Sequence, residues 1–386
     1  MEDDVRRALL AYFERDIGRP PIGARERVVA GLDASSRRPR RPYAAWAAAV
    51  AALLIAVVVV ATLLAVRGLH PRTQPARQNP VPVPRSGAAI AYDQDRGVLV
   101  MFGGTVNGTT PLGDTWTWDG ARWTERHPAV SPPLSAFGPQ NTPGPGPKPQ
   151  SFPGLLMADD PASGSLVLYG IPGGTWTWDG RSWHRFASAP PQRGTNDAAA
   201  MAYDPSSAAV LLYLMPAGAS GQTWRWDGAT WTELHPRTTP DVVMGSLAFD
   251  GRRLLLFGTP FGPVRGQFVT RTWEWDGTDW SLLAPAVALA TGYTFTAAYD
   301  QARGRIVVYL SYPGGGPETW LWDGATWSRV HPQHEPPAGS GAAAWYDSRT
   351  REVALYDGTA TATATAAGDI WTWDGTDWRS TEGTGP

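Results

Sequence analysis

A nine-residue tryptophan motif recurs six times in the C-terminal part of the chain and constrains its fold more than any other feature. The pattern is [T/I]-W-x-W-D-G-x-x-W, and its copies begin at Thr115, Thr175, Thr223, Thr272, Thr319 and Ile370. Successive copies start 60, 48, 49, 47 and 51 residues apart, and together they hold 18 of the 20 tryptophans. A repeat of this length is typical of stacked or ring-forming architectures, in which each unit buries its apolar surface against its neighbours.

Each repeat unit has the pattern of four short antiparallel strands. An apolar stretch that ends in an aromatic residue and an aspartate, as at Tyr92-Asp93, precedes a second apolar run and then the tryptophan motif. Trp116 and Trp118 lie two residues apart, so they share one face of a strand, and Asp119-Gly120 predicts a tight turn. In the second unit, Asp159 stands where the other units have the aromatic residue. Six such units without intervening helices predict an all-β fold, a six-bladed β-propeller over residues 85–380.

The same segments resemble a known group of repeats. The aromatic-Asp turn, the Gly103-Gly104 pair and the T-W-x-W-D-G-x-x-W segment are similar to bacterial Kelch-type repeats of the galactose oxidase central-domain superfamily. This resemblance covers roughly three quarters of the chain and implies a propeller of Kelch-like blades. The double glycine is clear only in the first unit, and the paired Gly-His element of WD40 repeats is missing.

Composition excludes several chemistries. The chain has no cysteine, which rules out disulfides, thiolate nucleophiles and cysteine-ligated metals. The Cys-modified tyrosine of galactose oxidase copper chemistry is excluded for the same reason. The net charge is -2 and the basic residues are dispersed, so we expect no nucleic-acid binding. We also expect no cofactor.

An apolar segment before the repeats predicts a membrane anchor. Residues Tyr43 to Val66 form a run of 24 without a charge, about 36 Å long as a helix, which is enough to cross a bilayer. Because 42 residues precede it, an anchor is favoured over a cleaved signal peptide. Six arginines lie within 20 positions on its N-terminal side and four on its C-terminal side. The positive-inside rule therefore places the N-terminus in the cytoplasm and the propeller outside it, with the lipid bilayer as a partner of residues 43–66.

The expected organisation has five parts: a partly helical cytoplasmic tail at 1–42, the transmembrane helix at 43–66, a Pro-rich linker at 67–84, the propeller at 85–380 and a C-terminal tail at 381–386. Val5, Leu9 and Tyr12 follow helical spacing in the first part. That tail loosely resembles the cytoplasmic tails of some bacterial anti-sigma-like regulators. It lacks their zinc-binding His-x3-Cys-x2-Cys motif.

Strand alternation sorts the connections onto two faces. If strands a to d of each blade run outward from the centre, the a–b and c–d turns lie on one face and are short and repetitive. The b–c and d–a connections lie on the other, vary widely between units, and suit ligand binding on a rigid scaffold. We call these the short-turn face and the variable face. Predicted ligand-binding residues on the variable face are Asn107, Asp114, Asp197, Arg265, Arg271, Glu318 and Asp369.

No catalytic or metal-ligating constellation stands out. His127, His235 and His331 recur in the same H-P position, but they belong to blades one, three and five and would lie too far apart to share a metal. The repeated tryptophans are interpreted as packing between blades, since identical positions in every unit indicate identical structural roles. Carboxylates suited to glycoside hydrolysis are present in Asp114, Asp197, Glu318, Glu335 and Asp369.

Three functions therefore stay open. The leading hypothesis is a membrane-anchored extracytoplasmic propeller that binds a protein or glycan ligand through its variable face. The alternatives are an envelope enzyme acting on glycans, with its site at the propeller channel, and a sensor coupled through the membrane helix to the cytoplasmic tail. Propellers host binding and catalysis alike, so the fold alone does not choose between them.

Overall fold

The computed structural model describes residues 80–85, 87–106, 110–133, 155–170, 174–186, 197–260, 269–292, 294–311, 316–337, 342–357 and 369–381. The chain divides into two compact units, Met1–Gln78 and Asn79–Pro386, and the described residues all belong to the second. Their regular structure consists of strands without an α-helix, so nothing in these ranges could cross a membrane as a helix. The predicted tail and the predicted helix at 43–66 lie outside the described residues.

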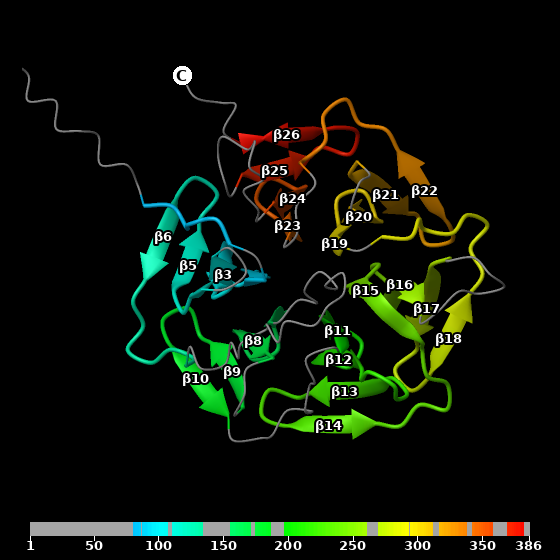
Figure 1. Ribbon diagram of the computed structural model, residues 1–386, viewed down its shortest axis with the longest axis horizontal. Coiled ribbons are helices and arrows are strands. Elements are labelled where there is room, and N and C mark those ends of the chain that lie inside the picture. Colours follow the sequence, from blue (N-terminus) through cyan, green and yellow to red (C-terminus); the bar gives the residue numbers. More distant parts are fainter. Residues whose placement is uncertain are drawn as a thin grey trace, which may run out of the picture. The chain divides into compact units, whose positions relative to one another are not determined.

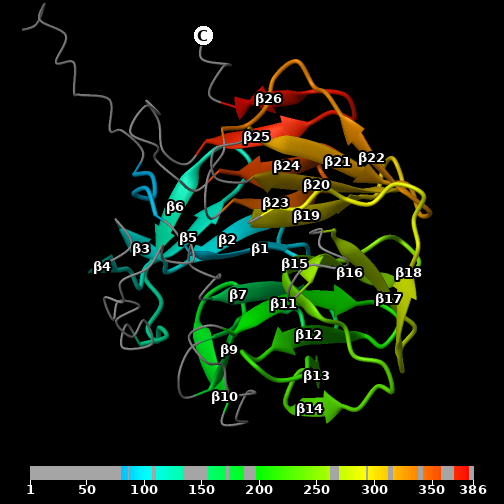
Figure 2. The ribbon, with the colours of Figure 1, turned by 45° about the vertical axis from the view of Figure 1, so that its right-hand side comes forward.

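Six four-stranded antiparallel sheets form a ring, as predicted (Figure 1). Blades 1 to 3 consist of β1 (Ala89–Asp93), β2 (Val98–Phe102), β5 (Thr115–Trp118) and β6 (Trp123–Arg126); β7 (Leu156–Asp160), β8 (Ser165–Tyr169), β9 (Thr175–Trp178) and β10 (Trp183–Phe186); and β11 (Ala198–Asp204), β12 (Ala209–Met215), β13 (Gln222–Trp226) and β14 (Trp231–Leu234). Blades 4 to 6 consist of β15 (Val242–Phe249), β16 (Leu254–Pro260), β17 (Arg271–Trp275) and β18 (Trp280–Leu283); β19 (Thr294–Asp300), β20 (Arg305–Ser311), β21 (Glu318–Trp322) and β22 (Trp327–Val330); and β23 (Ala343–Asp347), β24 (Glu352–Tyr356), β25 (Ile370–Trp373) and β26 (Trp378–Ser380). Each blade is one continuous segment, with its first strand innermost and its fourth outermost (Figures 1 and 2). The b–c connection of blade 1 adds a two-stranded hairpin, β3 (Thr105–Val106) and β4 (Thr110–Pro111), which was not predicted from the sequence.

The tryptophan motif builds the outer two strands and the turn between them. In blade 1, Asp119 Oδ1 accepts hydrogen bonds from the backbone amides of Ala121 and Arg122 at 2.9 and 2.8 Å. Gly120 adopts a φ of 97°, which favours glycine. Trp118 and Trp123 then face each other with ring centroids 5.5 Å apart. The turn is therefore fixed by local side-chain and backbone chemistry, and the other five copies repeat it.

The contacts between neighbouring blades, here called seams, share one aromatic pair. The aromatic residue near the end of each b strand packs edge-on against the third motif tryptophan of the next blade. Phe257 and Trp327 are an example, with centroids 5.0 Å apart and planes at 63°. The ring closes in the same way between blades 6 and 1, where Tyr356 and Trp123 lie 5.9 Å apart at 71°. Closure is therefore made by packing between contiguous blades.

A hydrogen bond accompanies this pair at five of the six seams. The indole Nε1 of the third motif tryptophan donates to the first motif threonine of the preceding blade, at 2.6 to 2.9 Å. These bonds are Trp183–Thr115, Trp231–Thr175, Trp280–Thr223, Trp327–Thr272 and Trp378–Thr319. At the closing seam Ile370 takes the place of the threonine and packs with Trp123 in one apolar cluster. The sixth copy's departure from threonine thus falls at the point of closure.

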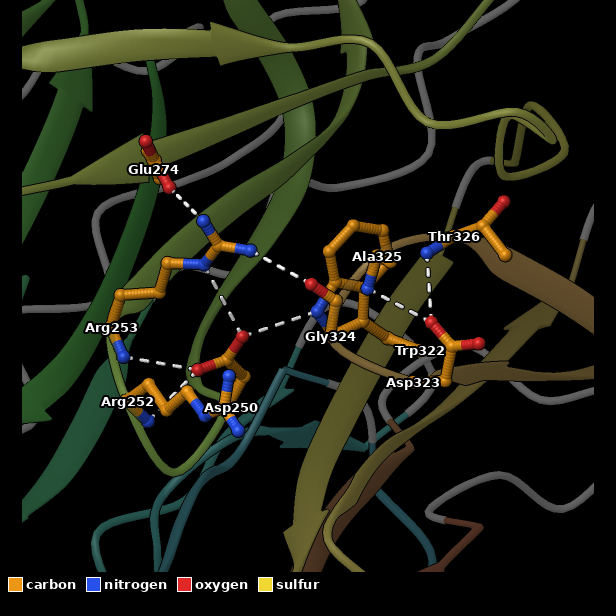
Figure 3. Close-up of polar contacts among 9 residues, drawn as sticks. All are labelled: Asp250, Arg252, Arg253, Glu274, Trp322, Asp323, Gly324, Ala325 and Thr326. Atoms are coloured by element: carbon orange, nitrogen blue, oxygen red, sulfur yellow. Dashed lines mark hydrogen bonds and ion pairs between the residues drawn. The ribbon is translucent and has the colours of Figure 1, made fainter.

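Arginines on the short-turn face link neighbouring blades. In Figure 3, Arg253 of blade 4 pairs with Asp250 and Glu274 and donates to the backbone oxygen of Gly324 in blade 5 at 2.9 Å. Trp322 Nε1 donates to Asp250 Oδ2 at 3.2 Å. Arg96, Arg303 and Arg349 make cross-blade contacts to backbone oxygens of Gly164, Asp374 and Asp119. In blades 2 and 3 a serine takes the place of this arginine. Ser163 donates to Asp160, and Ser207 donates to Asp204.

Candidate ligand-binding face

Four of the predicted ligand-binding residues occupy one repeat position on the variable face. Asp114, Arg271, Glu318 and Asp369 each stand two residues before the first tryptophan of a motif, at or just before the start of the c strand. They belong to blades 1, 4, 5 and 6, so the ring distributes them around the face rather than gathering them at one point. Gly174 and Gln222 hold this position in blades 2 and 3.

The remaining predicted residues fall elsewhere. Asp197 lies just before β11, and its Oδ1 accepts a hydrogen bond from the Ala217 amide at 2.8 Å. It therefore joins the start of the a strand to the b–c connection of blade 3. Asn107 and Arg265 lie outside the described residues.

Asp114 is held as an anion at the closing seam. Both of its oxygens accept from the Arg85 guanidinium, at 2.6 and 2.8 Å, and Oδ2 also accepts from Trp116 Nε1 at 2.6 Å. Burial alone would raise the pKa of Asp114, but the hydrogen bonds from Arg85 and Trp116 outweigh it and lower the pKa. Arg85 is buried and also donates to the backbone oxygen of Gly103 at 2.9 Å.

Tyr356 lies among these charges. Burial raises its pKa, Arg85 lowers it, and Asp357 and Asp114 raise it, so all three charged groups act on the phenol. The tyrosine is 1% exposed, and its hydroxyl has no partner among the described residues. Its counterpart Tyr213 instead donates to the backbone oxygen of Pro240 at 2.7 Å.

Blade 5 repeats the arrangement seen at Asp114. Trp320 Nε1 donates to Glu318 Oε2 at 2.8 Å, and Arg329 pairs with Glu318 Oε1 at 3.0 Å. The Glu318 side chain is 7% exposed, whereas that of Arg329 is 44% exposed. Close by, burial raises the pKa of Glu335; Arg329 and His331 lower it, and Glu318 raises it further. A fixed carboxylate, an indole and a guanidinium therefore occur together in blades 1 and 5.

The other blades vary this theme. Gln222 accepts from Trp224 Nε1 at 3.2 Å in blade 3, and Arg271 pairs with Asp241 at 2.5 Å in blade 4. In blade 6 the backbone oxygen of Asp369 accepts from the Asp357 amide at 3.2 Å. The repeat position is thus polar in five blades, but its charge differs from blade to blade.

Sequence reasoning missed the partners of these residues. Arg329 had a readable signal, because it stands two residues after Trp327 and pairs in register with Trp320 on the neighbouring strand. Arg85 had none, since its contact with Asp114 joins residues 29 positions apart, one before β1 and the other before β5. Within the described ranges, no group of three or more histidine, aspartate or glutamate side chains is suited to hold a metal ion.

Comparison with known proteins shows the fold and no family. No protein-family model matches the sequence, and no curated protein matches it either. Among solved structures, a fucose-specific lectin from Aleuria aurantia is similar at 16% identity and a TM-score of 0.50, over 77% of this chain and 96% of the lectin. The protein YjhT is similar at 11% identity and a TM-score of 0.51, over 78% of this chain and 98% of YjhT. Propellers with lectin activity are therefore among its structural neighbours.

Proposed function

We propose that this propeller is a glycan-binding module whose ligand surface is the variable face. The observation that carries the proposal is the group of carboxylate, indole and guanidinium built in both blade 1 and blade 5. Sugar hydroxyls both donate and accept hydrogen bonds, so a fixed carboxylate beside a partly exposed guanidinium, as in blade 5, presents both kinds of partner, whereas the guanidinium of blade 1 is buried. Arg329 carries this role best, because its side chain is 44% exposed while Glu318 holds it in place.

The charge states favour binding over acid catalysis at these positions. A general acid on a glycosidase needs a carboxyl group that keeps its proton near neutral pH. Asp114 has a lowered pKa and both oxygens engaged, so it stays ionised. Such a group recognises a ligand better than it protonates one.

The proposed attachment of the module to a membrane rests on the sequence. We infer that residues 43–66 anchor the chain in a membrane, that the N-terminus is cytoplasmic, and that the propeller lies outside the cytoplasm. The Kelch-like character of the blades belongs to the same proposal and rests on the repeated motif and the Gly103-Gly104 turn. The lectin-like structural neighbours support glycans over proteins as the ligand class.

The test is a binding screen of the detergent-solubilised full chain against immobilised mono- and oligosaccharides, fucosides included. The variant Arg329→Gln removes the exposed guanidinium and should reduce retention at least tenfold. The matched control is Arg122→Gln, which removes an exposed arginine from the short-turn face and should leave retention unchanged. Equal binding by both variants, or no retention of the wild-type chain on any glycan, would contradict the proposal.

Glycan hydrolysis is the second candidate, and Glu335 is the observation that favours it. Burial raises the pKa of Glu335, which lies near the ionic pair of Glu318 and Arg329, and a raised carboxyl pKa is the direction that a general acid needs. Following product release in the same wells separates the two functions. Turnover that survives purification and is abolished by Glu335→Gln would replace binding by catalysis.

A further inference from the structure

One seam of the ring differs from the others in a way that the repeat makes visible. In five blades an aromatic residue and an aspartate stand at the end of the a strand or directly after it, and in blade 2 this pair is Asp159 and Asp160. At the closing seam the aromatic residue, Tyr92, donates its hydroxyl proton to Asp347 of the preceding blade at 3.1 Å. A tyrosine there satisfies a buried aspartate across the seam.

In blade 2 the residue that corresponds to Tyr92 is Asp159, and it faces Asp93, the aspartate of the preceding blade. Asp159 faces the a–b turn of blade 1: it interacts with the charges of Asp93 and Asp95, and the Gln94 amide gives it one hydrogen bond. Its Oδ2 is buried and finds no partner in the part of the chain that the structure describes. Two carboxylates in such a place repel each other unless one of them holds a proton.

Asp93 is already paired with a cation of its own turn. Both of its oxygens are engaged by Arg96, through the backbone amide at 3.0 Å and the guanidinium at 2.8 Å. Asp160 accepts from the Ser163 hydroxyl at 2.8 Å. Within the described residues, neither Asp159 nor Asp160 has a cation, and burial raises the pKa of both. Asp159 also faces the charges of Asp93 and Asp95, and Asp160 has the Ser163 hydroxyl as a donor, so the proton falls to Asp159.

We propose that the seam between blades 1 and 2 is a pH-sensitive joint, closed by a proton on Asp159 and loosened when that proton is lost. The groups that face Asp159 are the carboxylates of Asp93 and Asp95 with the Gln94 amide from blade 1, Asp160 on its own strand, and Tyr203 from blade 3. Arg96 lies in the same turn but is committed to Asp93 and to the backbone oxygen of Gly164.

The direction of the effect follows from linkage. Burial, with Asp93 next, raises the pKa of Asp159 to about 7, whereas an aspartate in the unfolded chain titrates near 4. Below pH 4 both states hold the proton. Between pH 4 and 7 the unfolded state loses it first, so the stability that this proton confers falls as the pH rises, and the loss is complete above pH 7.

The test measures unfolding of the full chain in detergent by urea between pH 4.5 and 8.5. Relative to Asp159→Asn, the wild-type unfolding constant should rise about tenfold per pH unit between pH 5 and 6.5, the dependence that one released proton produces. Asp159→Tyr, which restores the residue of the other blades, should remove the same dependence. Asp95→Asn, which removes one of the carboxylates that raise the pKa of Asp159, should retain the dependence but end it at a lower pH.

Hydrogen exchange locates the effect. After correction for intrinsic rates, β1 and β7 of the wild-type chain should lose protection between pH 5 and 7 while β15 and β16 keep theirs. Parallel pH curves for wild type and Asp159→Asn would overturn the proposal, as would a loss of protection spread evenly over all blades. Stabilisation of the wild-type chain at pH 8 by millimolar Ca²⁺ or Mg²⁺, absent in Asp159→Asn, would also overturn it, because a metal rather than a proton would then close the seam.

Discussion

The hydrogen bond between Trp327 and Thr272 tests whether the seams are held by polar contacts as well as by packing. The bond is 2.9 Å long, and the two residues are 0% and 2% exposed. Thr272→Val keeps the shape of the side chain but leaves a buried indole N–H without an acceptor. Orphaning such a donor costs about 1–3 kcal/mol, so the variant should unfold at lower urea by that free energy.

A double-mutant cycle isolates this bond from the packing around it. Trp327→Phe removes the donor and retains an aromatic ring against Phe257, whose ring lies 5.0 Å from that of Trp327. Because Thr272→Val has no donor left to orphan in this background, the double variant should be less destabilised than the sum of the two, by about 1 kcal/mol. Circular dichroism during urea unfolding gives the free energies without relying on tryptophan emission.

The closing seam supplies the matched control. Ile370 stands where the other seams have threonine, so Ile370→Val and Trp123→Phe form a cycle in which no hydroxyl takes part. Its coupling energy measures packing alone. If the Thr272 cycle is additive to within about 0.5 kcal/mol, or no larger than the Ile370 cycle, the hydrogen bonds of the seams contribute nothing beyond packing.

Two further predictions concern the turns of the tryptophan motif. Gly324→Ala should lower the free energy of unfolding by about 1–2 kcal/mol, measured by thermal unfolding, because its φ of +98° disfavours alanine. Nothing lies within 4 Å of the added Cβ, so this loss comes from the backbone alone. Gly180→Ala should lose more, because its added Cβ would also meet the Arg96 guanidinium. In the turn of blade 2, burial would raise the pKa of Asp179, but the His184 ring and two backbone amides lower it to about 2. The stability from this carboxylate is therefore present above pH 4 and lost as the pH falls toward 2; His184→Ala should raise the carboxyl pKa in an NMR titration, and an unchanged value would show that the amides alone set it.

The fold was predictable because its determinants are local and repeated. The turn of Asp119 and Gly120, and the two tryptophans that share a strand face, follow from residues less than ten positions apart. Six copies of that local solution leave a ring as the way to bury both faces of every sheet. The hairpin of β3 and β4 escaped prediction because Thr105–Val106 and Thr110–Pro111 are two residues each, too short to show a strand period.

The candidate site was predictable only in part. Asp114 and Glu318 were selected for lying on the variable face, and their common repeat position makes the geometry of one informative about the other. Their partners come from different places: Arg329 from the next strand of the same blade, and Arg85 from the segment before the ring. A contact of the second kind joins residues 29 positions apart, which no local pattern in the sequence specifies.

The seams share their aromatic pairs, so their polar groups decide how they differ. The closing seam lacks the Trp–Thr bond, but Arg85 with Asp114, Tyr92 with Asp347 and Arg349 with the Asp119 backbone oxygen cross or border it. The closing seam therefore has polar contacts of its own, although the hydroxyl is missing. The first seam keeps its Trp183–Thr115 bond yet sets Asp159 against Asp93, a conflict that only a proton relieves. The joint that we propose to respond to pH therefore lies one seam away from the closing seam, where a carboxyl group stands in place of an aromatic ring.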